Sequence, residues 1–207
     1  MISVITTITN RKNLKTLQEN LVALEADWHL GVDLLCLVGN ENLYLEVRDY
    51  VASAVDKGEP LVVYDDKGLK AGQEYLGSRN EYVFLLGENI RIPTGCLTKL
   101  MKDFDNKKSA GFIGGVRKEL PSVYWVDDIY GSPHYVYSNE KKDLEGLIEV
   151  DVSPVYGLLT KTQLYKELFC LSDLDGYGSL SYGIRLRRQG YKNYLSMEVG
   201  LRDGGEK

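Results

Sequence analysis

Residues 81–93 run Glu-Tyr-Val-Phe-Leu-Leu-Gly-Glu-Asn-Ile-Arg-Ile-Pro, and this stretch decides the fold. Its apolar part, Tyr82–Leu86, is typical of a strand buried on both faces of a parallel sheet. The chain then turns polar at Gly87, Glu88 and Asn89. Ligands of open α/β sheets bind at the carboxyl ends of such strands. An acid and an amide placed there predict either a divalent cation that holds a diphosphate or a plain polar turn.

Strand and helix patterns alternate on the amino-terminal side of this stretch. Apolar runs predict strands at Ile2–Ile5, Asp33–Val38 and Leu61–Tyr64, and helical spacing of apolar residues predicts helices at 14–24, 43–54 and 69–76. Such alternation favours a parallel sheet with right-handed crossovers. The predicted fold class is therefore α/β, with a Rossmann-like, mostly parallel central sheet flanked by helices.

The carboxyl-terminal side continues in the same style. Thr94 is predicted to cap a helix over 97–104. Further strands are predicted at 111–116, 122–126, 147–152 and 191–197, and helices at 162–168 and 180–189. Residues 157–159 are expected to begin the passage into the first of these helices. Residues 127–142 are expected to form a loop that shapes a pocket, and 198–207 a polar tail.

Composition describes one ordinary globular domain over residues 1–207, with 43% hydrophobic and 27% charged residues. A net charge of −5 argues against a nucleic-acid partner. The cysteines Cys36, Cys96 and Cys170 are odd in number and lack C-x-x-C spacing, so buried thiols are predicted. Without a signal peptide or an apolar run of roughly 20 residues, no transmembrane segment is expected and a cytoplasmic location is predicted.

Four segments together resemble a known enzyme family. Residues 3–11, 81–89, 157–164 and 184–191 (Ile-Arg-Leu-Arg-Arg-Gln-Gly-Tyr) are similar, in order, to the opening strand, acidic motif, small-residue strand and final helix end of GT-A-fold glycosyltransferases, within their large inverting family. The resemblance implies a single GT-A domain with a nucleotide-binding half at 1–93 and an acceptor-side half at 94–207. It further implies inverting transfer of a sugar from a nucleotide-diphosphate sugar to an unidentified glycan, lipid or protein acceptor, with Mn²⁺ or Mg²⁺ as cofactor.

The chain departs from the family pattern at three places. Gly87-Glu88-Asn89 stands where the family has Asp-x-Asp, which reduces the charge that can hold a metal ion. Gly178-Ser179 replaces an acidic pair that supplies the general base, and Val38-Gly39-Asn40 replaces a common Asp. The resemblance is therefore to a family member with a degenerate metal motif.

The resemblance implies roles for particular acids. For the metal it indicates Glu88 and Asn89, with Asp203 in the tail as a further ligand, and solvated surface roles are the alternatives. For the general base it indicates Asp151 or Asp175, followed by Asp173. Asp151 ends an apolar run, where a carboxylate needs a partner or a task, although a structural cap on the turn at residue 153 also accounts for it.

The nucleotide and its diphosphate are assigned to strand ends and to two helix faces. The candidates implied by the resemblance are Thr6, Thr7, Arg11, Asp65, Asp66, Lys70, Gln73, Arg185 and Arg188. Arg185 and Arg188 share a helix face that excludes Arg187, because residues three apart are neighbours on a helix. Ordinary turn chemistry at 65–68 and solvated helix faces are the alternatives.

Two other functions compete with sugar transfer. The weakened acidic motif and the Gly178-Ser179 gap favour a catalytically degenerate protein that binds nucleotide sugars. A sugar-phosphate nucleotidyltransferase shares the architecture, but its glycine-rich loop does not follow the first strand, where Thr6–Arg11 stands instead.

Overall fold

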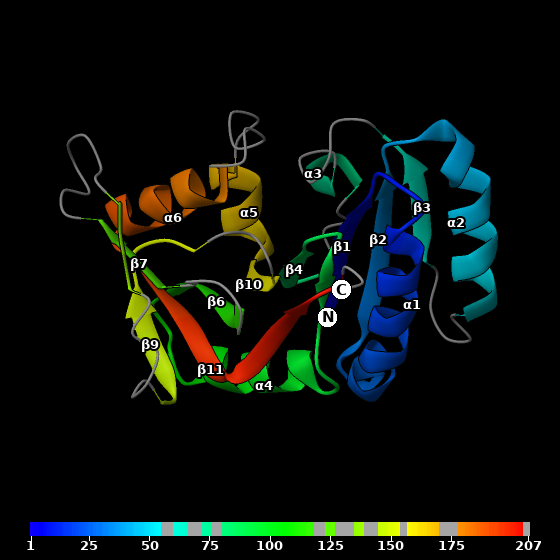
Figure 1. Cartoon of the computed structure of the whole chain (residues 1–207). Helices are drawn as coiled ribbons and strands as arrows, with labels where there is room; N and C mark the ends of the chain where they lie inside the picture. Colours follow the sequence, from blue (N-terminus) through cyan, green and yellow to red (C-terminus); the bar gives the residue numbers. More distant parts are fainter. Residues whose placement is uncertain are drawn as a thin grey trace.

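The computed structural model describes residues 1–54, 60–65, 72–75, 80–117, 123–126, 135–138, 145–153, 157–169 and 178–204. A nine-stranded sheet crosses the molecule and carries helices on both faces (Figure 1). Its strand order is β3-β2-β1-β4-β10-β6-β11-β5, and β9 pairs with β11 outside this order. The predicted α/β sheet flanked by helices is confirmed.

The amino-terminal half of the sheet is parallel. It consists of β1 (Ile2–Ile8), β2 (Val32–Val38), β3 (Leu61–Tyr64) and β4 (Tyr82–Leu86). The register places Thr6 between Cys36 of β2 and Leu86 of β4. Every residue of β4 is buried, because β4 lies inside the sheet between two layers of helices. The predicted parallel pairing is confirmed for this half.

The carboxyl-terminal half contains antiparallel strands as well, although β6 and β11 keep the direction of β1–β4, so most strands of the sheet are parallel as predicted. It consists of β5 (Ile90–Arg91), β6 (Ala110–Arg117), β9 (Leu147–Val150), β10 (Gly157–Lys161) and β11 (Lys192–Asp203). Strand β10 runs antiparallel between β4 and β6, whereas β6 and β11 run parallel to each other. Residues 157–161 thus form a complete central strand before the next helix begins.

Two predicted irregular segments contain strands. Strand β11 continues to Asp203 where a polar tail was predicted from residue 198, because Val199 and Leu201 are fully buried. Strands β7 (Val123–Val126) and β8 (Tyr135–Ser138) form a separate antiparallel pair, so the predicted loop over 127–142 is wrong at 135–138. The rest of that loop lies outside the described residues.

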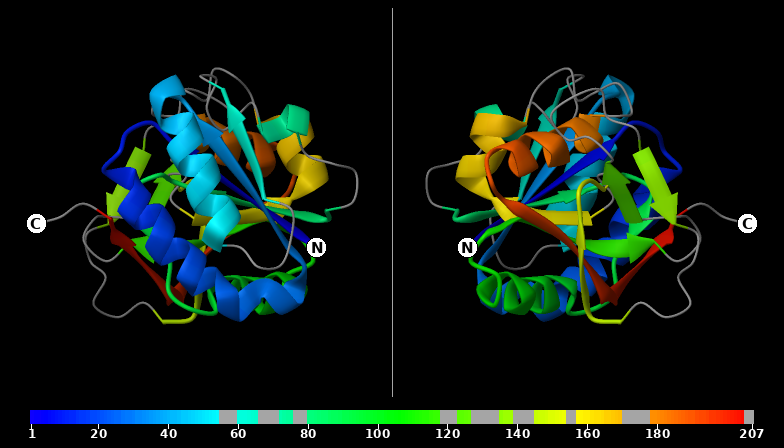
Figure 2. Two further views of the ribbon diagram at one scale, coloured as in Figure 1. Left: turned by 90° about the vertical axis from the view of Figure 1, so that its right-hand side faces the viewer. Right: turned by 90° about the vertical axis from the view of Figure 1, so that its left-hand side faces the viewer.

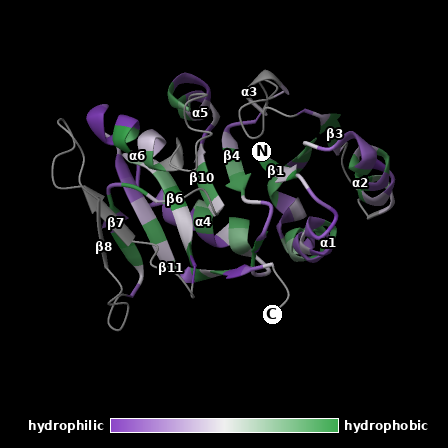
Figure 3. Cartoon of the chain, turned by 45° about the horizontal axis from the view of Figure 1, so that its top comes forward, coloured by the Kyte–Doolittle hydropathy of each residue, from purple (hydrophilic) through white to green (hydrophobic). Residues whose placement is uncertain are grey.

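The helices form a layer on each face of the sheet. One face carries α1 (Asn13–Leu24), the 3₁₀ helix η1 (Glu25–Leu30), α2 (Glu41–Ala54) and α4 (Cys96–Asp105). The other face carries α3 (Gly72–Tyr75), α5 (Thr162–Leu168) and α6 (Gly178–Arg188). In Figure 3 hydrophobic residues concentrate along the central strands between these layers.

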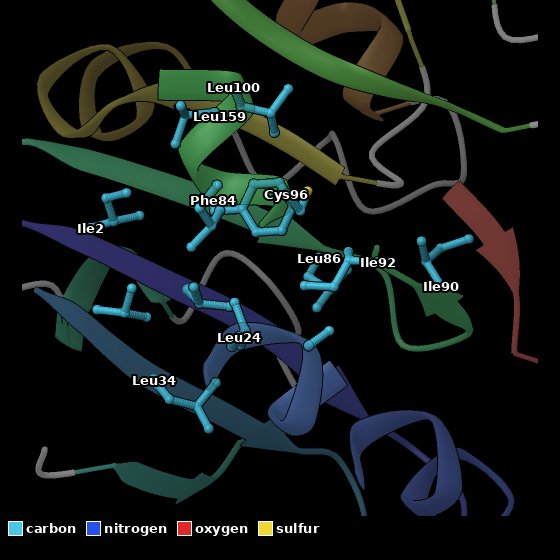
Figure 4. Close-up of a cluster of buried hydrophobic side chains, with 14 of the residues drawn as sticks. Ile2, Leu24, Leu34, Phe84, Leu86, Ile90, Ile92, Cys96, Leu100 and Leu159 are labelled. Atoms are coloured by element: carbon cyan, nitrogen blue, oxygen red, sulfur yellow. The ribbon is translucent and has the colours of Figure 1, made fainter. Parts of the chain in front are cut away.

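The larger hydrophobic cluster lies under α1, α2 and α4. Figure 4 shows Phe84 of β4 among side chains from several elements, including Cys96 and Leu100 of α4 and Leu159 of β10. All four are fully buried. Truncating a buried phenylalanine costs about 3–5 kcal/mol, so this cluster anchors the strand from which residues 87–89 emerge.

Helix α4 is capped differently from the prediction. Its N-cap is Gly95, which has φ of 71° and makes no side-chain cap, so the predicted capping role of Thr94 is wrong. Asp27 of η1 performs it instead. This fully buried carboxylate accepts hydrogen bonds from the backbone N–H groups of Leu97 and Thr98, each at 3.0 Å, and from the Thr98 hydroxyl at 2.6 Å.

The cysteine prediction is confirmed for two of the three residues. Cys36 and Cys96 are free and buried, whereas Cys170 lies outside the described residues. Burial raises the pKa of the Cys36 thiol to about 12, which makes it unreactive. Among the described helices, none has the length and apolar content required to cross a bilayer.

Candidate functional site

Polar residues gather where the parallel strands end, and we call this side of the sheet the carboxyl edge. Strands β6 and β11 share it with β1–β4, because β10 is antiparallel to both β4 and β6. The residues that close or follow these strands are Thr9, Gly39, Asp65, Gly87, Arg117 and Asp203. The opposite side, where the same strands begin, is the amino edge. In Figure 2 the first residue, at the start of β1, and the red end of β11 lie on opposite sides of the molecule.

Glu88 connects the end of β4 with the end of β1. Its Oε2 accepts hydrogen bonds from the Thr9 backbone N–H at 3.0 Å, the Thr9 hydroxyl at 2.6 Å and the Asn13 side-chain amide at 2.7 Å. Bonds to a charged acceptor are worth more than neutral ones. The carboxylate therefore fixes the loop between β1 and α1 against the segment after β4.

Helix α1 holds the next residues through a polar seam, which we define as Asn13, Thr16 and Asn20. The buried Asn20 amide donates to the Ile90 carbonyl at 2.7 Å and accepts from the Ile92 N–H at 3.0 Å. The Thr16 hydroxyl donates to the Gly204 carbonyl at 3.4 Å. Spacings of three and four residues place all three on one helix face, so the seam aligns residues 88–92 with the end of β11.

Asp203 and Arg117 form an ion pair at the carboxyl edge. Arg117 closes β6 and its side chain is 14% exposed, whereas that of Asp203 is 41% exposed. Asp203 pairs in the backbone ladder with Ile90 of β5, and the Gly204 N–H donates to the Asn89 carbonyl at 2.6 Å. The ion pair is thus held beside residues 87–89, and the predicted proximity of Asp203 to that segment is confirmed by the strand pairing.

The predicted nucleotide residues of the first strands lie at this edge but not on one face. Thr6 is buried and Thr7 half-buried, and neighbouring strand residues face opposite sides of the sheet. The Arg11 side chain is 78% exposed and pairs with Glu46 of α2 at 3.1 Å. The half-buried Asp65 extends β3, because its N–H donates to the Val38 carbonyl at 3.0 Å.

Four other predicted residues cannot be placed. Asp66 and Lys70, and the base candidates Asp173 and Asp175, lie outside the described residues. Gln73 belongs to α3, of which only the backbone is described at that position. Their proposed roles stay predictions.

Asp151 lies at the amino edge, away from the other candidates. It follows β9, whose Val150 pairs with Asn193 at the start of β11. Its carboxylate forms an ion pair with Arg187 at 3.1 Å, and Arg187 also binds Glu149 at 3.1 Å. This carboxylate therefore has a partner, and it lies at the opposite end of the strands from Glu88.

The arginines of α6 are also at the amino edge, because the helix ends just before β11 begins. Arg185 donates to the Leu168 carbonyl at 2.6 Å, and Arg188 is exposed. The expectation that Arg185 and Arg188 share a cleft with residues 87–89 is therefore corrected. Arg187, which helical spacing separates from them, pairs with Glu149 and Asp151.

The predicted metal ligands do not form a cation site as they stand. Mg²⁺ and Mn²⁺ favour about six oxygen ligands with carboxylates among them. One oxygen of Glu88 already accepts three hydrogen bonds, Asn89 is uncharged, and Asp203 neutralises Arg117. Across the described ranges there is no group of three or more His, Cys, Asp and Glu side chains that could hold a metal ion.

A cavity of about 550 Å³ opens at the amino edge. It is lined by residues that precede β4 and begin α5, among them Asn80, Glu81, Lys161 and Thr162. None of the predicted site residues lines it. Its walls carry charges of both signs, from Glu81, Lys161, Lys166 and Glu167.

Comparisons with known proteins bear on the fold. No protein-family model matches the chain, and no curated protein does. Among solved structures the chain is similar to one described as the crystal structure of GalNAc-T7 with UDP, GalNAc and Mn²⁺, with a TM-score of 0.73 over 98% of this chain. The chain has a GT-A-like fold. At 9% identity the likeness establishes the fold alone, and the chain covers only 43% of that neighbour's length.

The sequence alone did not reveal the residues that organise the carboxyl edge. The polar seam of α1 is visible in retrospect as Asn13, Thr16 and Asn20 at helical spacing. Arg117 is marked only by its position at the end of an apolar, glycine-rich run. Its pairing with Asp203 requires that β6 and β11 are adjacent in the sheet, and no local sequence pattern predicts this adjacency.

Proposed function

We propose that the chain transfers a sugar from a nucleotide-diphosphate sugar to an acceptor hydroxyl. The observation that carries this proposal is the likeness of nearly the whole chain to a glycosyltransferase crystallised with UDP, GalNAc and Mn²⁺. A second support is the position of the polar residues, since open α/β sheets bind ligands at the carboxyl ends of their strands. Residues 1–93 form the nucleotide-binding half in this proposal, and 94–207 the acceptor-side half.

The donor is placed along the carboxyl edge. Its base and ribose lie at the ends of β1 and β3, near Thr7, Arg11 and Asp65, and its diphosphate lies beside residues 87–89. The Asp65 carboxylate can accept hydrogen bonds from a base N–H or a ribose hydroxyl. The hydrogen bonds from Thr9 and Asn13 to Glu88, which we call the Glu88 clamp, hold the loops at this edge in place before the donor binds. Less conformational entropy of these loops is then lost on binding.

The reaction is a displacement at the anomeric carbon. The bond from that carbon to the diphosphate oxygen breaks, and the leaving nucleoside diphosphate keeps the electron pair. The acceptor oxygen forms the new bond and its proton passes to a carboxylate, with inversion when attack comes from the opposite face. Asp175 and Asp173 remain the candidates for this base. Asp151 is not proposed as the base, because it is paired with Arg187 at the amino edge.

Nucleotide binding tests this proposal directly. A ligand that binds only the folded protein raises its melting temperature, so UDP and GDP are titrated in a thermal-shift experiment. Asp65→Asn is expected to weaken binding roughly 10-fold, as for the loss of a hydrogen bond to a charged group. Arg48→Ala is the matched control, because Arg48 pairs with Asp49 on the surface of α2. Absence of binding by any nucleoside diphosphate contradicts the proposal.

A catalytically degenerate nucleotide-sugar binding protein is the second candidate. The three hydrogen bonds that one oxygen of Glu88 accepts from Thr9 and Asn13 favour it, because they give this carboxylate a structural role. The two functions differ in turnover. A transferase slowly hydrolyses UDP- or GDP-sugars when no acceptor is present, and a binding protein leaves them intact over the same period.

A further inference from the structure

Gly39 lies in the middle of a row of three residues at the carboxyl edge. Its N–H donates to the Ile8 carbonyl at 3.1 Å, and the Asp65 N–H donates to the Val38 carbonyl at 3.0 Å. The backbone ladder thus continues one residue past β2 and β3, and Thr9, Gly39 and Asp65 follow β1, β2 and β3 in neighbouring positions. Adjacent strands lie about 4.8 Å apart, so Thr9 and Asp65 stand on either side of the glycine.

This row faces the helix layer of α3 and α5. Side chains alternate between the two faces of a strand. Leu37 of β2 and Val63 of β3 come two residues before Gly39 and Asp65, and both pack in the hydrophobic cluster on that face. Leu37 is fully buried whereas Gly39 is exposed, so the row reaches solvent directly beyond the core.

The fold does not require a glycine at this position. Gly39 has no positive φ, unlike Gly31 at 70°. A Cβ at Gly39 would meet one described atom within 4 Å, Cγ2 of Thr9 at 3.6 Å, which is an ordinary contact. At Gly115, by contrast, a Cβ would approach Cγ of Leu201 to 2.8 Å. Neither backbone conformation nor packing therefore accounts for Gly39, and the close approach of a ligand to the backbone is another reason for a glycine.

Glu88 fixes the side of this gap that β1 provides. Its Oε2 accepts hydrogen bonds from the Thr9 hydroxyl at 2.6 Å and the Thr9 N–H at 3.0 Å. The bond to the hydroxyl restricts χ1 of Thr9, and the methyl carbon Cγ2 then lies on the Gly39 side. A glycine backbone and a methyl group suit the apolar face of a flat ring better than they suit a charged group.

We propose that Gly39 is a specificity-determining residue that seats the base of the bound nucleotide, with the Thr9 methyl group packed against the ring. This inference rests on the proposed function, which places the base at the ends of β1 and β3. A side chain at position 39 would occupy the space of the ring. It would exclude the base and leave the segment at residues 87–89 as it is.

The test measures UDP binding to the full chain by calorimetry in the presence of MnCl₂. Gly39→Val is expected to weaken binding roughly 10-fold or more, because the added side chain overlaps the ring. Its melting temperature should not fall, since the backbone admits a Cβ and glycine favours the unfolded chain. Thr9→Ser keeps the hydroxyl and removes only the methyl group, and it is expected to weaken binding about 4-fold.

The matched control is Ala52→Leu, which adds apolar bulk at an exposed position in the last turn of α2. It should leave UDP affinity unchanged. Wild-type affinity in Gly39→Val overturns this inference and leaves the proposed function standing, and so does wild-type affinity in Thr9→Ser if the valine variant fails to fold. Failure of the unmodified chain to bind any nucleoside diphosphate overturns the proposed function and this inference with it.

Discussion

The two edges of the sheet each contain an arginine bound to an aspartate, yet they are built differently. At the amino edge Arg187 binds both Glu149 and Asp151, and Lys192 binds Glu149 again at 2.8 Å, so charges satisfy one another. At the carboxyl edge most contacts of the single clamping acid are with hydroxyl, amide and backbone groups. A charge network of this kind is typical of a structural role, whereas the carboxyl edge is organised mainly by one acid that accepts hydrogen bonds from neutral donors.

The largest expected effect concerns the polar seam of α1. Asn20→Ala leaves the Ile90 carbonyl and the Ile92 N–H buried without their partner, and should cost about 3 kcal/mol of unfolding free energy. Urea denaturation measures it. Gln18→Ala, an exposed change on the same helix, should alter stability by less than about 0.5 kcal/mol. Equal effects for the two variants would show that the seam does not hold the carboxyl edge.

The second-largest effect is expected at Glu88, whose carboxylate accepts hydrogen bonds from Thr9 and Asn13. Glu88→Ala removes the acceptor of three hydrogen bonds and should cost about 2 kcal/mol, because the Asn13 donor is buried whereas both Thr9 donors are exposed. Glu46→Ala removes an exposed carboxylate paired with Arg11 and should cost no more than about 1 kcal/mol. If Glu88→Ala instead left stability unchanged and made UDP binding fail, Glu88 would be a ligand-binding residue and the contrast between the edges would break.

The charge network of the amino edge predicts a smaller loss. Arg187→Met leaves Glu149 and Asp151 without their shared cation and should cost about 1 kcal/mol, since the three side chains retain some exposure. The same variant should bind UDP like the wild type. Impaired UDP binding would place the amino edge in the functional site and contradict the distinction drawn between the two edges.

The smallest effect is a dependence of stability on pH. The hydrogen bond from Lys192 lowers the pKa of Glu149. Because the lowered pKa belongs to the folded state, the stabilisation is present above the ordinary value of roughly 4.3 and is lost as pH falls through the lowered one. The melting temperature of Glu149→Gln should therefore lie below that of the wild type at neutral pH and approach it in acid. A constant difference at all pH values would exclude this charge effect.

Most of the first half of the fold was predictable, and much of the second half was not. Strands such as Tyr82–Leu86 can be recognised from the sequence, because burial on both faces requires an unbroken apolar run. Strand β10 was indicated only by the family resemblance of residues 157–164, since its apolar residues lie directly before α5 and periodicity cannot separate a short strand from a helix start. The length of β11 was missed because polar residues interrupt it at Glu198 and Arg202.

The candidate site shows the same division. Asp203 was correctly brought to the segment after β4, because the family resemblance carried its place in the chain order. Asp151 was misplaced, since an acid at the end of an apolar run looks the same at either edge of a sheet. Asp27 went unnoticed as a cap, because it lies 70 residues from the helix that it stabilises.

Local patterns were enough to establish an α/β chain with buried strands and amphipathic helices, because strand and helix periods depend on neighbouring residues alone. Which polar and charged side chains contact one another depends on the order of the strands in the sheet. Thr9 reaches Glu88 across 79 positions and Arg117 reaches Asp203 across 86, because β1 lies beside β4 and β6 beside β11. Those pairings arise from the packing of the whole sheet, and they set the chemistry of its carboxyl edge.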